Sequence, residues 1–171
     1  SNHPFNGFIQ LNAAQQDAVR TALQTWTNVA NLTLTEVPSS AATSHLRFSG
    51  SQTPQTAEAA LPSLGDQSSG DCWFGPADYT TLEWPQHGEP YWGAIHEIGH
   101  TLGLKHPHQD ASDLSIGGGT LPAGEDSMEL SVMSYRSYPG GVSGAGLTIP
   151  AGSYPTTPMV NDIATERKSV V

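Results

Sequence analysis

The chain of 171 residues predicts an α+β fold in a single domain, residues 1–171. Three observations support this class. A helical repeat of apolar residues opens the chain, several short β-rich segments follow, and a second helical pattern leads into a tail rich in glycine and proline. We expect a sheet and the second helix within about residues 1–103, and a loop-rich half with one last helix in about residues 104–171.

The first expected helix covers about residues 12–30. Asn12 is a good N-cap, and Gln15 three positions later completes the pattern of a capping box. Apolar residues recur at helical spacing along one face: Val19, Ala22, Leu23, Trp26 and Ala30.

Four segments after this helix are predicted to form strands. They are residues 31–37, 45–48, 56–61 and 72–74, which are bounded by proline or by turn residues. Together they predict a sheet between the two main helices.

The second helix is expected to open near Pro90 and to end at about Leu102, because proline suits a first helical turn and Gly103 suits a helix end. Irregular glycine-rich segments follow. A final helix is predicted to begin at Asn161 or Asp162, either of which can cap it, and to run to about Lys168.

Composition and charge exclude several classes of function. Six basic and sixteen acidic residues give a net charge of −10, so the chain lacks the basic patch that nucleic acid binding requires. No apolar run approaches the length of a membrane span. The single cysteine, Cys72, cannot form an internal disulfide; beside Trp73 and Phe74 we interpret it as a buried thiol, with contact to a metal as the alternative.

Three histidines in the second helix and just after it have the spacing of a metal site. His96 and His100 are four residues apart, so a helix places both rings on one face. His106 lies beyond the helix, and a turn at Gly103 can bring it back to the same ion. Three imidazole ligands favour zinc and leave one position open for water, as in catalytic sites.

Glu97 lies between the two helical ligands, where a carboxylate can reach the water on the metal and act as general base. Two simpler interpretations exist. The histidines could merely face solvent, or the site could hold metal without catalysis. The second interpretation leaves Glu97 without a purpose.

The segment 96–106 resembles the zinc signature of the metzincin proteases. Segment 131–135, which contains Met133 and Tyr135, resembles the methionine turn of that clan. Within the clan the chain is most similar to the serralysins, because Pro107 follows the third histidine and the turn reads Ser-x-Met-Ser-Tyr. Residues 12–37 and 161–164 resemble the first helix and strand and the start of the last helix of that family.

The resemblance implies a zinc endopeptidase that hydrolyses internal peptide bonds in one metzincin-like protease domain. It also implies a mixed twisted sheet, an active-site helix and a C-terminal helix. Tyr135 would be a further metal ligand that swings away to hydrogen-bond the tetrahedral intermediate, and Met133 would form an apolar floor. Segment 57–61 would be the edge strand that pairs with an extended polypeptide substrate; an ordinary sheet strand is the alternative.

The chain also departs from the serralysin pattern. No glycine-rich calcium-binding repeat is present, so calcium is a suggested cofactor without a supporting motif. Six carboxylates in loops offer the remaining candidates: Asp66, Asp71, Asp110, Asp113, Glu125 and Asp126. His108 stands where the family usually has glycine; we interpret it as an exposed loop residue, with a spare metal contact as the alternative. Arg136 stands where an aromatic residue is common.

The resemblance further implies a secreted, bacterial, monomeric protein whose partners are polypeptide substrates and a protein inhibitor or pro-segment. Two rival functions are a binding module that holds metal without cutting and a hydrolase for another bond, such as a cell-wall amidase. The presence of Met133 and Tyr135 favours a peptidase.

Overall fold

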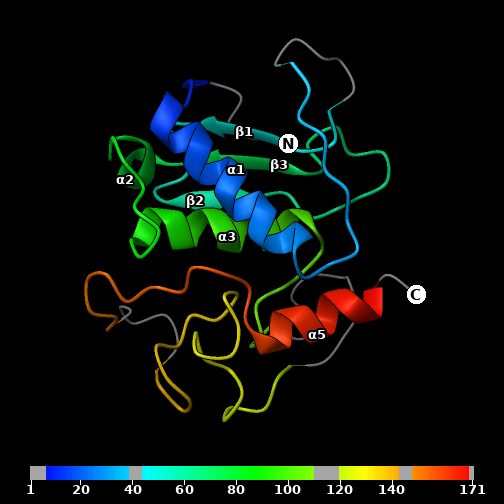
Figure 1. Cartoon of the computed structure of the whole chain (residues 1–171), viewed down its shortest axis with the longest axis vertical. Helices are drawn as coiled ribbons and strands as arrows, with labels where there is room; N and C mark the ends of the chain where they lie inside the picture. Colours follow the sequence, from blue (N-terminus) through cyan, green and yellow to red (C-terminus); the bar gives the residue numbers. More distant parts are fainter. Residues whose placement is uncertain (1–6, 39–43, 110–119, 143–147, 170–171) are drawn as a thin grey trace.

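The computed structural model describes residues 7–38, 44–109, 120–142 and 148–169. The elements, in chain order, are α1 (Ala13–Thr27), β1 (Arg47–Gly50), β2 (Ala57–Ala59), β3 (Asp71–Phe74), α2 (Pro76–Tyr79), α3 (Glu89–Thr101) and α5 (Val160–Ser169). Strands and helices are segregated along the chain, and α5 lies in the loop-rich second half (Figure 1). The predicted α+β class is confirmed.

The described strands form a mixed sheet in the order β1-β3-β2. β1 runs parallel to β3, with Phe48 opposite Cys72, and β2 runs antiparallel to β3, with Ala59 opposite the same residue. Three of the predicted strands are therefore found, with shifted ends. Within the described sheet β2 is an edge strand, because β3 is its only neighbour.

The predicted strand at residues 31–37 is wrong. This segment has no strand pairing among the described residues, and Leu34 and Val37 are 39% and 44% exposed. A strand needs a partner and a buried face, whatever its β propensity. Here the segment is instead tied to α1 by an exposed ion pair, in which Arg20 contacts Glu36 at 2.8 Å.

Helix α1 has the predicted capping box. The Asn12 side chain accepts a hydrogen bond from the Gln15 backbone at 2.9 Å, and the Gln15 side chain accepts one from the Asn12 backbone at 2.9 Å. The helix ends at Thr27, three residues before the predicted end. Trp26 is fully buried and its indole N–H donates to the Ile95 carbonyl at 3.1 Å, which fixes α1 against α3 (Figure 1).

The short helix α2 is absent from the prediction. Pro76 begins it directly after Gly75, and this Gly-Pro pair is a local signal for a helix start. Gly75 is required for packing, because a Cβ atom there would lie 2.2 Å from the carbonyl oxygens of Pro54 and Thr56. Among the described residues, no helix has the length and apolar character needed to cross a bilayer.

Candidate metal centre

Helix α3 carries the first two histidines of the site in its buried second half. It begins after Gly88 and ends with Leu102 as C-cap, close to the predicted limits. His96 and His100 are 2% and 8% exposed. Gly99, between them, packs against the methionine turn: a Cβ atom there would lie 2.5 Å from the Met133 sulfur. The helix can therefore approach Met133 closely only with glycine at this position.

The turn at Gly103 returns the chain to the helix, as predicted. Gly103 has φ +105°, a conformation that glycine adopts without strain, and the Leu104 N–H donates to the Gly99 carbonyl at 3.0 Å. The return brings Nε2 of His106 to 3.1 Å from Nε2 of both His96 and His100. The structure thus brings all three predicted ligands together.

The protonation of these rings fits a metal ion. Nδ1 of His96 lies 2.8 Å from the Val132 carbonyl oxygen, and Nδ1 of His100 lies 2.7 Å from that of Leu104. Because a carbonyl oxygen only accepts, both Nδ1 atoms donate, and both Nε2 atoms direct lone pairs toward His106. Nε2 of His106 can donate a proton to only one of them, so a cation between the three nitrogens is what satisfies all of their lone pairs.

The spacing and the charge state also fit zinc. Two nitrogens bound tetrahedrally at about 2.0–2.1 Å are about 3.3 Å apart, close to the observed 3.1 Å. Burial, with the neighbouring imidazoles, lowers the pKa of His96 and, to about 3, that of His106. Burial likewise lowers the pKa of His100. All three rings are therefore neutral, which is the form that binds metal, and they could bind zinc.

Tyr135 lies directly against two of the three candidate ligands, His96 and His106. Its ring stacks on that of His96, with centroids 5.4 Å apart and planes 11° apart, and its centroid is 4.3 Å from that of His106. Burial, followed by the charge of Glu97, raises the pKa of the Tyr135 phenol to about 12. The phenol is therefore protonated at neutral pH and can donate a hydrogen bond.

Glu97 is buried beside the first ligand and is 7% exposed. Burial, followed by the charges of Asp78 and Glu58, raises the pKa of its carboxyl group to about 8. Bound zinc would oppose this shift, because a cation favours the ionised carboxylate. A carboxyl group with a pKa near neutrality can both accept and release a proton.

Two buried aspartates, whose contacts the sequence did not predict, hold the methionine turn (residues 131–135). Asp162 accepts hydrogen bonds from the Val132 N–H at 2.9 Å, the Ser131 hydroxyl at 2.6 Å and the Met159 N–H at 2.8 Å. Helix α5 begins at Val160, before the predicted Asn161 or Asp162, so Asp162 lies within its first turn and is not its N-cap. The bond to Met159 satisfies an N–H just before the helix, and the other two bonds join α5 to the methionine turn. Asp126 accepts from the Ser134 hydroxyl at 2.5 Å and from Arg136 at 2.8 Å.

His108 and Cys72 are both withdrawn from solvent, one in part and one fully. The expectation that His108 is exposed is wrong: it is half-buried, and its ring stacks on that of His106 with centroids 5.4 Å apart. The loop folds back over the ligand, which residue type alone does not reveal. Cys72 is buried as expected, at 1% exposed, and lies outside the group of possible metal ligands among the described residues.

Among the described residues, the candidate calcium ligands do not form a cluster. Asp110 and Asp113 lie outside the described residues. Asp71 and Asp126 are paired with Arg47 and Arg136. Within the described part of the chain, the three histidines are the group identified as able to hold a metal ion.

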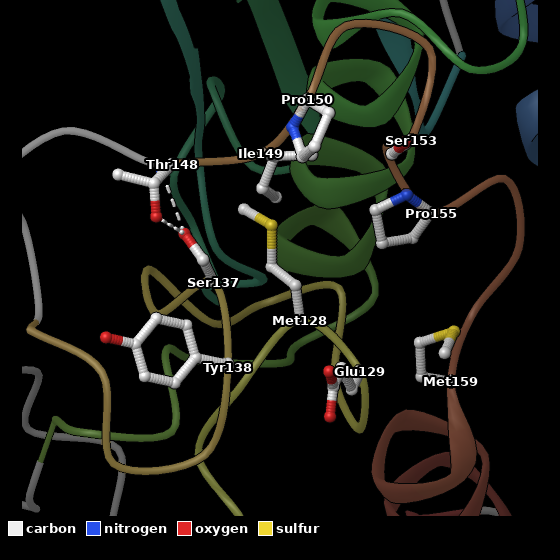
Figure 2. Close-up of a pocket in the computed structure, with 10 residues that line it drawn as sticks. All are labelled: Met128, Glu129, Ser137, Tyr138, Thr148, Ile149, Pro150, Ser153, Pro155 and Met159. Carbon is white, nitrogen blue, oxygen red and sulfur yellow. Dashed lines mark hydrogen bonds between the residues drawn. The ribbon is translucent and has the colours of Figure 1, made fainter.

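A separate cavity of about 460 Å³ lies in the loop-rich half (Figure 2). Its lining excludes the three histidines and Tyr135, although Ser137 on one wall follows Tyr135 by two residues. Ser137 accepts a hydrogen bond from the Thr148 N–H at 2.9 Å across this wall. The lining residues are Met128, Glu129, Ser137, Tyr138, Thr148, Ile149, Pro150, Ser153, Pro155 and Met159.

The fold and the site together have the arrangement of a metzincin-type peptidase domain: a mixed sheet, a helix with two candidate ligands, a glycine turn to the third, and a methionine turn packed against the helix. The family model described as Matrixin matches residues 8–115, which is more than half of the chain. The chain therefore belongs to the Matrixin peptidase family.

Similar proteins support the same assignment. The chain is 33% identical to Metallopeptidase AprA of Pseudomonas marginalis, over 98% of this chain and 36% of that protein. It is 34% identical to Serralysin A of Dickeya chrysanthemi, over 92% of this chain and 33% of that protein. It is 35% identical to the serralysin of Photorhabdus sp. (strain Az29), with the same coverage. The chain spans about a third of the length of these relatives.

Proposed function

We propose that residues 1–171 form the catalytic domain of a zinc-dependent endopeptidase that cleaves internal bonds of polypeptides. The observation that carries this proposal is the convergence of three neutral imidazole nitrogens at 3.1 Å, with Glu97 next to one of them in the helix. Membership in the Matrixin family and the similarity to serralysins support it.

Zinc bound by His96, His100 and His106 would acidify a water molecule and polarise the carbonyl group of the bond to be cut. In this proposal Glu97 accepts the proton of the attacking water and later passes it to the leaving amine. The Tyr135 phenol would be a further ligand to zinc before substrate binds. During the reaction it donates a hydrogen bond to the oxygen that gains negative charge.

The substrate is proposed to bind as an extended strand along β2. Within the described sheet this strand has one free edge, so its backbone groups are available for pairing with another chain. We further propose that the protein acts as a secreted bacterial monomer, as the resemblance to serralysins implies. A protein inhibitor or a pro-segment that occupied the same edge would block access to the histidines.

Glu97→Gln tests the general base, because glutamine keeps the size of the side chain but cannot accept the proton. We expect casein cleavage to fall by about 10²–10⁴-fold while zinc stays near one ion per chain. Glu89→Gln is the matched control, since Glu89 is exposed in the first turn of the same helix. Cleavage by Glu97→Gln at the parent rate would remove Glu97 from this role.

Mass spectrometry of a digested peptide library separates the rival functions. Cuts at internal peptide bonds are the expected result. Loss of a cell-wall amide alone would indicate a different hydrolase, and binding without products would indicate a recognition module.

A further inference from the structure

The three candidate zinc ligands are not held in the same way. His96 and His100 each donate from Nδ1 to a backbone carbonyl, at 2.8 and 2.7 Å. Nδ1 of His106 is buried and makes no bond of hydrogen-bond geometry among the described residues, although the Gln109 side chain lies near the ring and opposes the fall in its pKa. Metal-binding histidines almost always have such a partner, which fixes the orientation of the ring. The orientation of His106 must therefore have another source.

Two aromatic rings flank His106. The His108 ring lies parallel to it, with centroids 5.4 Å apart and planes 6° apart, and the Tyr135 ring lies 4.3 Å away at 40°. The separation from His108 is within the range of about 4.5–7 Å for favourable ring pairs, and the Tyr135 ring packs slightly closer than that range. Nδ1 of His108 is likewise buried without a partner in the described part of the chain. His108 therefore meets His106 through the face of its ring and not through this nitrogen.

A tight turn holds His108 in this position. The Gln109 N–H donates to the His106 carbonyl at 3.1 Å, and the Gln109 side chain accepts from the His106 N–H at 3.1 Å. Pro107 restricts the backbone between them, and its carbonyl accepts from the Leu121 N–H at 2.9 Å. This turn folds the chain back over His106, so the stacked arrangement is built into the loop.

We propose that His108 is a positioning residue that holds the third zinc ligand by ring stacking, in place of the hydrogen bond that holds each of the first two. The inference rests on the proposed zinc site. It predicts that the ring at position 108, and not its nitrogen atoms, sets how long His106 stays on the metal.

The test is the rate at which zinc passes from the folded protein to an excess of a chromogenic chelator at fixed pH. His108→Phe keeps a flat ring without nitrogen, His108→Asn keeps a polar nitrogen without a ring, and His108→Ala removes both. We expect His108→Phe to release zinc within about twofold of the parent rate. We expect His108→Asn and His108→Ala to release it about three- to tenfold faster than the parent. His87→Ala, at an exposed histidine, controls for the loss of a histidine as such.

A second measurement reports ligand geometry directly. The visible spectrum of the cobalt-substituted protein is expected to be unchanged in His108→Phe and shifted in His108→Ala. Fast zinc release by His108→Phe together with a parent-like rate for His108→Asn would overturn the proposal, because it would assign the role to a nitrogen. A parent-like rate of zinc release by His108→Ala would overturn it as well. Failure of the parent to bind one zinc per chain would instead defeat the proposed function itself.

Discussion

At the scale of single residues, the positions of protons decide what the centre can do. The carbonyls of Val132 and Leu104 fix the protons of His96 and His100 on Nδ1, so Nε2 is left free to bind metal. The Tyr135 phenol keeps its own proton because burial raises its pKa to about 12. The centre therefore combines imidazole nitrogens that can bind a cation with a phenol that can donate a hydrogen bond.

Tyr135→Phe tests that proton donor. Removing the hydroxyl should lower kcat by about 100-fold, because a donor to a developing oxyanion is lost. Bound zinc should stay near one per chain, since the three histidines remain. Steady-state kinetics with metal analysis measures both, and Tyr138→Phe, at an exposed tyrosine, is the control. An unchanged kcat would show that the phenol has no part in the reaction.

Asp78 provides a test of pH dependence. Burial, followed by the charge of Glu89, raises its pKa to about 6, and Oδ2 has no partner among the described residues. Because the folded pKa exceeds the unfolded value, this group costs stability as pH rises from about 4 to about 6, and the cost persists above.

Asp78→Asn should therefore raise the free energy of unfolding by about 2 kcal/mol at pH 8 and by much less at pH 4. Urea unfolding of the chelated protein at both pH values measures the difference. Glu83→Gln, at an exposed carboxylate, should show no such pH dependence. An equal effect of Asp78→Asn at both pH values would show that ionisation is not the cause.

The identities of the candidate metal ligands could be predicted because their relation is local. The spacing of His96 and His100 follows from the helical repeat, and Gly103 indicated how His106 returns. The positions of His108 and Asp162 could not be predicted in the same way. His108 depends on the conformation of an irregular turn, and Asp162 depends on contact with a segment about thirty residues away; no periodic pattern records either.

At the scale of elements, the same distinction between local and distant interactions explains the fold. Helices α1 and α3 were predicted within a few residues, because their caps and apolar faces are properties of the helix itself. The strand expected at residues 31–37 failed, since a strand exists only with a partner. Helix α2 was missed because it has only four residues and therefore no repeat.

The close approach of α3 to the methionine turn gives an element-scale prediction. Gly99→Ala would place a Cβ atom 2.5 Å from the Met133 sulfur and 3.1 Å from the Trp26 ring. We expect a loss of about 2 kcal/mol of stability from overpacking, and weaker zinc binding because Met133 must move. Thermal unfolding and zinc titration measure these effects.

Gly93→Ala in the same helix is the matched control, because a Cβ atom there meets nothing within 4 Å. It should stabilise the protein by about 0.5–1 kcal/mol, as alanine does in a helix interior. If both variants raised the melting temperature, the contact between α3 and Met133 would not be the tight one described.

At the scale of the whole molecule, Val132 is one of the residues that join the two halves of the chain. Its carbonyl accepts from the Trp92 indole at 3.1 Å and lies 2.8 Å from Nδ1 of His96, so it binds two residues of α3. Its N–H donates to Asp162 of α5 at 2.9 Å. The orientation of one candidate ligand is thereby coupled to the last helix, about thirty residues further along the chain.

This coupling predicts that zinc stabilises the whole protein and not only the loop that carries His106. A ligand present at about 1,000 times its Kd adds about 4 kcal/mol, which shifts Tm by about 10 °C in a chain of this size. Chelation should therefore lower Tm by that amount in one cooperative transition, and added zinc should restore it. If chelation left Tm unchanged, or melted residues 104–109 alone as seen by hydrogen exchange, the metal would not be coupled to the fold through Val132.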